Sequence, residues 1–110
     1  VLGNLGLESI KFAVLALHTS LIVVLGHENC GAVKAVVTDH THLIPDIAKQ
    51  IEEHCKAEDL TQCIKQNIQG VVADIKKDPE IYALLKTSQI EVAGGYYELA
   101  TGRVSFLTCS

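Results

Sequence analysis

A short segment that joins an apolar strand to a helix constrains this fold more than any other part of the chain. Five apolar residues, Leu21 to Leu25, are followed at once by Gly26 and His27, and Cys30 comes three residues later. A strand that is apolar on both faces is typical of the buried strands of parallel α/β sheets. Ligands commonly bind at the carboxyl ends of such strands. We therefore expect this strand to deliver an imidazole and a thiol to one site, at the start of the next helix.

His27 and Cys30 are candidate metal ligands, because imidazole and thiolate are the side chains best suited to hold zinc. A mononuclear zinc site takes at least three protein ligands, so these two residues leave a third to be found. The alternative role for Cys30 is that of a nucleophile in a phosphatase-type or rhodanese-type loop. Such a loop needs an arginine to clamp an oxyanion, and the one arginine of the chain, Arg103, lies in a distant predicted turn.

The apolar spacing along the chain predicts a single α/β domain over residues 1–110. We expect a mainly parallel sheet that is flanked by helices and ends in an antiparallel hairpin. The Gly94-Gly95 pair allows either a bulge in the second strand or a close approach of the backbone to another element. The expected helices are 7–17, 31–38, 46–56, 60–75 and 80–86, and the expected strands are 21–25, 90–93 continued by 96–99, and 104–107.

The expected strand at 21–25 needs neighbours on both of its edges, but the chain offers it only one parallel partner. An apolar strand edge without a partner is an aggregation hazard. We therefore expect either that part of the sheet is missing from this sequence or that another subunit covers the edge. The sequence begins with Val1 rather than methionine, and we expect that Val1 is not the native start.

The composition excludes several classes of partner. The net charge is −4 and the lysines are scattered, which argues against nucleic acid. No apolar run approaches the roughly 18 residues of a membrane span. The four cysteines are irregularly spaced, which favours free thiols in a reducing, cytoplasmic compartment. A Cys55–Cys63 disulfide is compatible with the sequence but nothing in it requires one.

The other histidines, cysteines and tyrosines are expected to serve the structure. His40 and His42 could bind a metal but fit a solvated loop better, and we also expect His54 to be solvated. Cys55 and Cys63 fall on apolar faces of expected helices and are predicted to be core residues. Tyr96 and Tyr97 should face opposite sides of their strand.

The motif Gly26-His27-Glu28-Asn29-Cys30-Gly31 resembles the Gly-His-x-x-Cys-Gly motif of β-class carbonic anhydrases. Other segments resemble parts of the same family. Residues 8–14 resemble its upstream helix, and residues 3–4 resemble the remnant of an Arg-Asn-Ala-Gly-Asn segment. Residues 67–75 resemble its long helix, and residues 92–97 with 101–104 resemble its closing hairpin. The resemblance covers essentially the whole chain and implies an incomplete β-carbonic-anhydrase-like fold.

The resemblance implies a zinc ion held by two cysteines and one histidine, of which His27 and Cys30 match two ligands. It also implies a substrate pocket bordered by the backbone of Gly31 and Ala32, and a homodimer or larger homo-oligomer. The family's first cysteine lies in a Cys-x-Asp-Ser-Arg motif that is absent here. The implied activity is reversible hydration of carbon dioxide to bicarbonate and a proton. With two ligands, the chain by itself is expected to be inactive.

Two functions remain open at this stage. The first is a carbonic anhydrase whose N-terminal segment is missing from this sequence. The second is a non-catalytic relative that keeps the scaffold for oligomerisation or binding, with a metal site that is incomplete or rebuilt. In the rebuilt form, Cys55, Cys63, Cys109 or a residue of a partner subunit would replace the missing cysteine.

Overall fold

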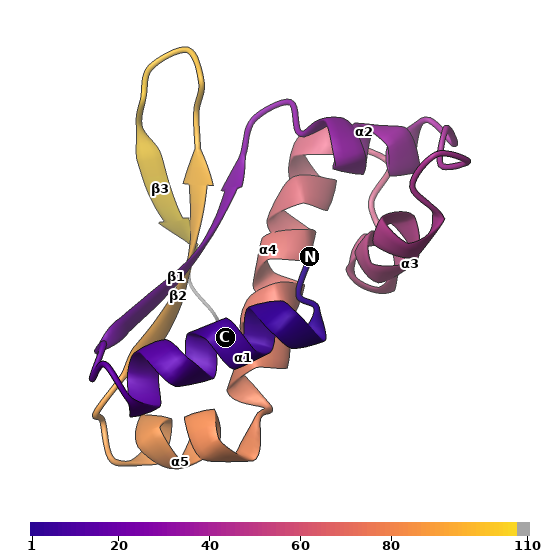
Figure 1. Cartoon of the computed structure of the whole chain (residues 1–110). Coiled ribbons are helices and arrows are strands. Elements are labelled where there is room, and N and C mark those ends of the chain that lie inside the picture. The colour runs from indigo at the N-terminus through magenta and orange to yellow at the C-terminus, as the bar shows by residue number, and fades with distance from the viewer. Residues whose placement is uncertain (108–110) are drawn as a thin grey trace.

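A three-stranded sheet in the order β1-β2-β3 organises the computed structural model, which describes residues 1–107. Figure 1 shows the long helix α4 running beside this sheet, with α1 and α5 near one of its ends and α2 and α3 near the other. The elements are α1 (Asn4–Leu15), β1 (Leu21–His27), α2 (Gly31–Val37), α3 (Pro45–His54), α4 (Leu60–Lys76), α5 (Pro79–Lys86), β2 (Glu91–Tyr97) and β3 (Val104–Leu107). The predicted α/β class and the C-terminal antiparallel hairpin are confirmed.

The register of the sheet aligns the carboxyl ends of its two parallel strands. β1 pairs with β2 from Leu21↔Glu91 through to His27↔Tyr97, without interruption. The pairing of β2 with β3 is also continuous across Gly94 and Gly95. The two glycines therefore form no bulge, and the alternative of a close approach is correct. A Cβ on Gly94 would lie 2.8 Å from Cγ2 of Ile68, on α4.

The core lies between α4 and one face of the sheet. Apolar residues recur at helical spacing along α4, and six of them are buried: Cys63, Ile64, Ile68, Val71, Val72 and Ile75. Towards one end of α4 they pack with Val14 of α1, Ile81 of α5 and Val92 of β2. Towards the other end they pack with Val33 of α2, Ile51 of α3 and Tyr96 of β2. All five helices therefore contribute to cores on the same face of the sheet.

The opposite face of the sheet is apolar and exposed within the described residues. Exposure alternates along β1, so that every second side chain faces away from the helices. Leu25 is 55% exposed and Phe106 of β3 is 67% exposed, and Leu21, Val23 and Val104 share this face with them. β1 is also an edge strand, so the unpartnered edge expected from the sequence is confirmed. Tyr96 is buried against the helices while Tyr97 faces the other side, as predicted.

Two expectations about α3 are wrong. Cys55 and Cys63 are joined by a disulfide that ties the end of α3 to the first turns of α4, so their thiols are not free. His54 is not solvated, because its side chain is only 18% exposed and its Nε2 lies 2.9 Å from Oδ2 of Asp74. Both pairs join α3 to α4 across the turn between them, which local sequence patterns do not report. No described helix is long and apolar enough to cross a membrane.

Asp78 links α5 to α1. Its Oδ1 accepts hydrogen bonds from the backbone N–H groups of Glu80 and Ile81, as an N-cap does. Its Oδ2 lies 3.3 Å from Nζ of Lys11, which also contacts Glu80 at 2.9 Å. Burial alone would raise the pKa of Asp78, but the hydrogen bonds from Ile81, Lys11 and Glu80 outweigh it and lower the pKa. The hydrogen bonds to Glu80 and Asp78 raise the pKa of Lys11.

We predict that Asp78→Ala lowers the free energy of unfolding by about 1–2 kcal/mol at neutral pH, because it removes the cap and the ion pair. Asp78→Asn should cost less, since the amide oxygen can still cap α5. Because folding lowers the pKa of Asp78, its ionised carboxylate stabilises the fold above the ordinary Asp pKa of 3.8. This stabilisation is lost as pH falls through the folded-state pKa. The difference between wild type and Asp78→Asn in urea unfolding should therefore shrink below pH 3.8, and a constant difference would contradict this assignment.

We predict that reducing the Cys55–Cys63 disulfide lowers the free energy of unfolding by about 2–3 kcal/mol. The reason is that the bond closes a loop between residues only eight positions apart and so restricts the unfolded chain. Urea unfolding with and without a thiol reductant measures the effect. The double variant Cys55→Ala, Cys63→Ala is the control, since its midpoint should not respond to reductant. An equal response of the control and the wild type would show that the bond contributes nothing.

Candidate metal centre

His27 and Cys30 stand on either side of a two-residue connection. His27 is the last residue of β1, and Cys30 is the N-cap of α2. Between them, Asn29 adopts a left-handed conformation with φ of 56°, which asparagine tolerates better than most residues. This turn joins the end of β1 to the start of α2. The predicted placement of both candidate ligands, at a strand end and a helix start, is confirmed.

Both residues line one cavity of about 350 Å³. Apart from these two and Asn67, its walls are aliphatic or glycine. They come from the end of β1, from α2, from α4 and from the N-terminus, and comprise Val1, Val24, Leu25, Gly26, Val33, Ile64, Ile68 and Val71. The cavity is therefore a mainly apolar space whose lining includes His27, Cys30 and Asn67.

Of the two glycines in the motif, Gly26 is the one that packing prevents from carrying a side chain. A Cβ at this position would lie 2.6 Å from Cγ1 of Ile68, which is closer than packed carbon atoms approach. The glycine therefore lets α4 lie directly against the end of β1. At Gly31 the situation is the opposite, because a Cβ there would meet nothing within 4 Å.

The ring of His27 is held by the main chain beside it. Its Nδ1 lies 3.0 Å from the carbonyl oxygen of Glu28. The N–H of Glu28 donates to the carbonyl of Tyr97 at 2.8 Å, and its carboxylate accepts from the N–H of Leu99 at 3.0 Å. The connection between the two candidate ligands is thus attached to the end of β2 and to the loop that follows it.

The donor atoms fit zinc in kind but not in number. A thiolate and an imidazole are zinc ligands, and Cys30 is a free cysteine among the described residues. Within residues 1–107, however, no group of three His, Cys, Asp or Glu side chains could hold a metal ion. The described part of the chain therefore offers two candidate donors, whereas a mononuclear zinc site needs at least three.

The other candidate residues do not join this pair. His40 contacts Oγ1 of Thr38 in the loop after α2, His42 is exposed, and Cys55 and Cys63 are bonded to each other. Cys109 lies outside the described residues. Gly31 opens α2, and Ala32 packs against the core beside Val33. The predicted role of their backbone in a substrate pocket stays a prediction.

Sequence reasoning missed two residues of this site, Glu28 and Asn67. Glu28 sits inside the motif, but its partner Leu99 is 71 positions away, so no local pattern reveals the bond. Asn67 lines the cavity, and its Oδ1 is buried without a hydrogen-bond partner in the described structure. A signal for Asn67 did exist, because a polar residue interrupts the apolar stripe formed by Ile64, Ile68 and Val71.

Comparisons with known proteins agree with the resemblance. A sequence model of the family described as carbonic anhydrase matches residues 3–104. A carbonic anhydrase of Mycolicibacterium smegmatis is 32% identical over 94% of this chain and 57% of its own length. The chain spans about half the length of the curated relatives it matches, 51% for carbonic anhydrase 1 of Escherichia coli O157:H7.

Solved structures share the fold. The β-carbonic anhydrase CafA of Aspergillus fumigatus matches the whole of this chain, with a TM-score of 0.81 and 19% identity, and the match covers 60% of CafA. One of two tetrameric β-carbonic anhydrases of Sordaria macrospora covers 93% of this chain, and the match covers 59% of that protein, with a TM-score of 0.73 and 22% identity. The chain therefore belongs to the carbonic anhydrase family, and its fold corresponds to part of the β-class fold, as expected.

Proposed function

We propose that this chain provides two ligands, His27 and Cys30, of a zinc site that hydrates carbon dioxide to bicarbonate and a proton. The observation that carries the proposal is that these two residues line one apolar cavity at the carboxyl end of a parallel strand. Family membership supplies the reaction, and the donor types agree with it. Zinc bound by three protein ligands and a water would supply a hydroxide nucleophile near neutral pH.

The walls of the cavity suit the proposed substrate. Carbon dioxide is small and apolar, and aliphatic side chains from α2 and α4 surround the space beside His27 and Cys30. Asn67 is the amide residue among the cavity walls, and its Oδ1 is buried without a hydrogen-bond partner in the described structure.

In this proposal the third protein ligand comes from outside the described residues of the same chain, because those residues contain no group of three donors that could hold a metal ion. Three sources fit: Cys109, a segment that this sequence does not include, or a partner subunit. A partner has a physical motive, since β1 presents an unpaired edge and an exposed apolar face. We propose a homo-oligomer on this basis. The solved relative from Sordaria macrospora is described as tetrameric.

A second candidate function is a non-catalytic scaffold of the same family. The observation that favours it is the shortage of donors among the described residues. The exposed sheet face would then serve oligomerisation or binding. The cytoplasmic location and a small-molecule substrate in place of nucleic acid stay predictions. The Cys55–Cys63 disulfide speaks against a reducing compartment, where such bonds are rare.

We predict that zinc binding by the chain depends on His27 and Cys30. His27→Ala or Cys30→Ser should each lower zinc affinity by at least about tenfold, because even the loss of a residue that hydrogen-bonds to a metal ligand lowers metal affinity by that factor. Competition with a chromophoric chelator measures the affinity. His42→Ala, an exposed histidine outside the cavity, is the matched control and should bind like the wild type.

Zinc content and stopped-flow hydration of carbon dioxide then separate the two functions. Full zinc occupancy, together with hydration that Cys30→Ser abolishes, supports the enzyme. If the single variant Cys109→Ser also loses both zinc and hydration, Cys109 is identified as the third ligand. Sub-stoichiometric zinc without hydration in the native, full-length protein would support the scaffold. Equal zinc affinity in wild type, His27→Ala and Cys30→Ser would reject the proposed site.

A further inference from the structure

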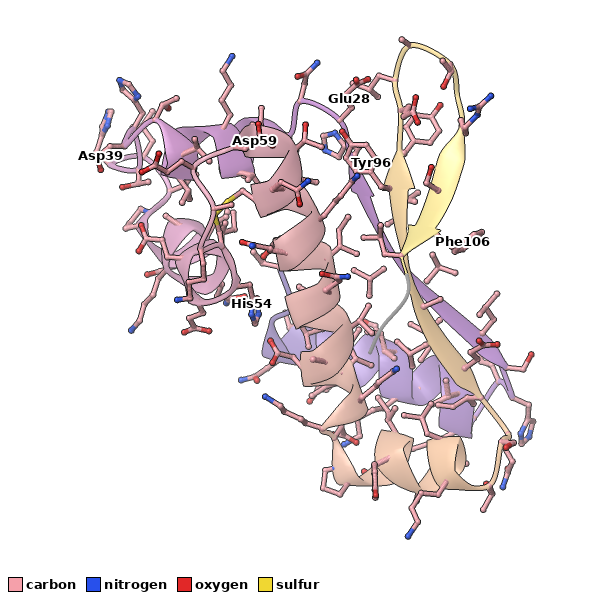
Figure 2. The ribbon with its side chains drawn as sticks, turned by 180° about the vertical axis from the view of Figure 1, so that it is seen from behind. Glu28, Asp39, His54, Asp59, Tyr96 and Phe106 are labelled. Atoms are coloured by element: carbon pink, nitrogen blue, oxygen red, sulfur yellow. A yellow bond between two sulfur atoms is a disulfide. The ribbon has the colours of Figure 1, made fainter. Side chains whose placement is uncertain are left out.

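Glu28 lies between the two candidate ligands, and each of its polar groups has a partner. Its N–H donates to the carbonyl of Tyr97 at 2.8 Å, its carboxylate accepts from the N–H of Leu99 at 3.0 Å, and its carbonyl oxygen lies 3.0 Å from Nδ1 of His27. Figure 2 shows Glu28 at the end of β1, beside the loop that joins β2 to β3. One residue thus connects that loop to the imidazole.

The loop that presents the Leu99 N–H is braced by its own hydrogen bonds. The N–H of Gly102 donates to the carbonyl of Glu98, and the N–H of Glu98 donates to the carbonyl of Arg103, both at 2.9 Å. The N–H of Arg103 donates to Oγ1 of Thr101 at 3.1 Å. Because the loop holds itself in shape, the Leu99 N–H is a fixed point to which the Glu28 carboxylate can attach.

The contact between Glu28 and His27 determines which ring nitrogen is free. A carbonyl oxygen only accepts hydrogen bonds, so Nδ1 of a neutral His27 must carry the proton that points at it. The lone pair then lies on Nε2, which is the nitrogen left to bind a metal or another donor. The tautomer and the direction of the ring therefore depend on the position of the Glu28 carbonyl.

We propose that Glu28 is a positioning residue, whose carboxylate ties its own backbone to the β2–β3 loop and thereby fixes the carbonyl that orients His27. The hairpin and the candidate metal ligands are in this way one mechanical unit. The inference rests on the proposed function only where it concerns zinc. The coupling between loop, Glu28 and imidazole holds for His27 in any role.

Three substitutions at one position test the proposal. Glu28→Ala removes the acceptor, Glu28→Asp keeps the charge but shortens the side chain so that it no longer reaches Leu99, and Glu28→Gln keeps an acceptor oxygen at the same reach. Glu98→Ala is the matched control, because it removes a carboxylate from the same loop that contacts Thr101 rather than Glu28. The Asp variant keeps the test valid if the Ala variant does not fold.

The first readout is the ¹⁵N chemical shifts of the His27 ring at alkaline pH, where imidazole is neutral, together with hydrogen exchange of the Leu99 amide. Wild type, Glu28→Gln and Glu98→Ala should show the Nδ1–H tautomer. Glu28→Ala and Glu28→Asp should show a mixture of tautomers, and their Leu99 amide should exchange about tenfold faster or more. An unchanged tautomer and exchange rate in both of these variants would overturn the proposal.

The second readout is zinc affinity, which should fall about tenfold in Glu28→Ala and Glu28→Asp and stay near wild type in Glu28→Gln. Changed tautomers with no zinc binding by the wild type would sustain the role of Glu28 and reject the proposed zinc site. Zinc binding that depends on His27 but not on Glu28, with an unchanged tautomer, would support the proposed zinc site and reject the role of Glu28. The two proposals therefore fail separately.

Discussion

The packing of α4 against β1 and β2 is the contact on which the rest of the structure depends. Ile68 sits where two glycines, Gly26 and Gly94, leave the sheet surface bare, so the helix approaches the backbone of both strands. Burying the apolar stripe of α4 there drives the fold, since apolar burial is the main favourable term in folding. The same contact forms one wall of the cavity that His27 and Cys30 share. Stability and the candidate site thus depend on one interface.

Among the described residues, helices cover only one face of the sheet. All five helices contribute buried apolar residues to one face, while Leu21, Leu25 and Phe106 are exposed on the other. Exposed apolar patches of this kind mark surfaces that contact something else. His27, one of the two candidate metal ligands, is the last residue of β1, and β1 also carries the open strand edge. An additional strand or subunit beside β1 would cover that edge and bring further residues close to His27, which agrees with our proposal that a third ligand comes from outside the described residues of this chain.

Contacts between distant parts of the chain hold the site in place. The connection between His27 and Cys30 is attached to the hairpin through Glu28. On the far side of the cavity, the Cys55–Cys63 disulfide and the His54–Asp74 pair attach α3 to α4. A cavity whose walls come from several elements keeps its shape only if those elements are joined to one another. These links join the walls to one another, although none of the linking residues lines the cavity itself.

The sequence by itself determined which elements exist and where the candidate ligands stand. Local signals were sufficient there: the apolar period of α4, the Asp78-Pro79 start of α5, and the apolar run that ends at Gly26 and His27. Its boundaries for α1 were shifted, since the chain leaves that helix early and turns at His18, whose φ is 59°. Only the tertiary structure decided the disulfide, the burial of His54, the bond from Glu28 to Leu99 and the face of the sheet left open. Those features depend on which distant residues meet, and periodicity along a chain records the local environment of a residue but not the identity of its partner.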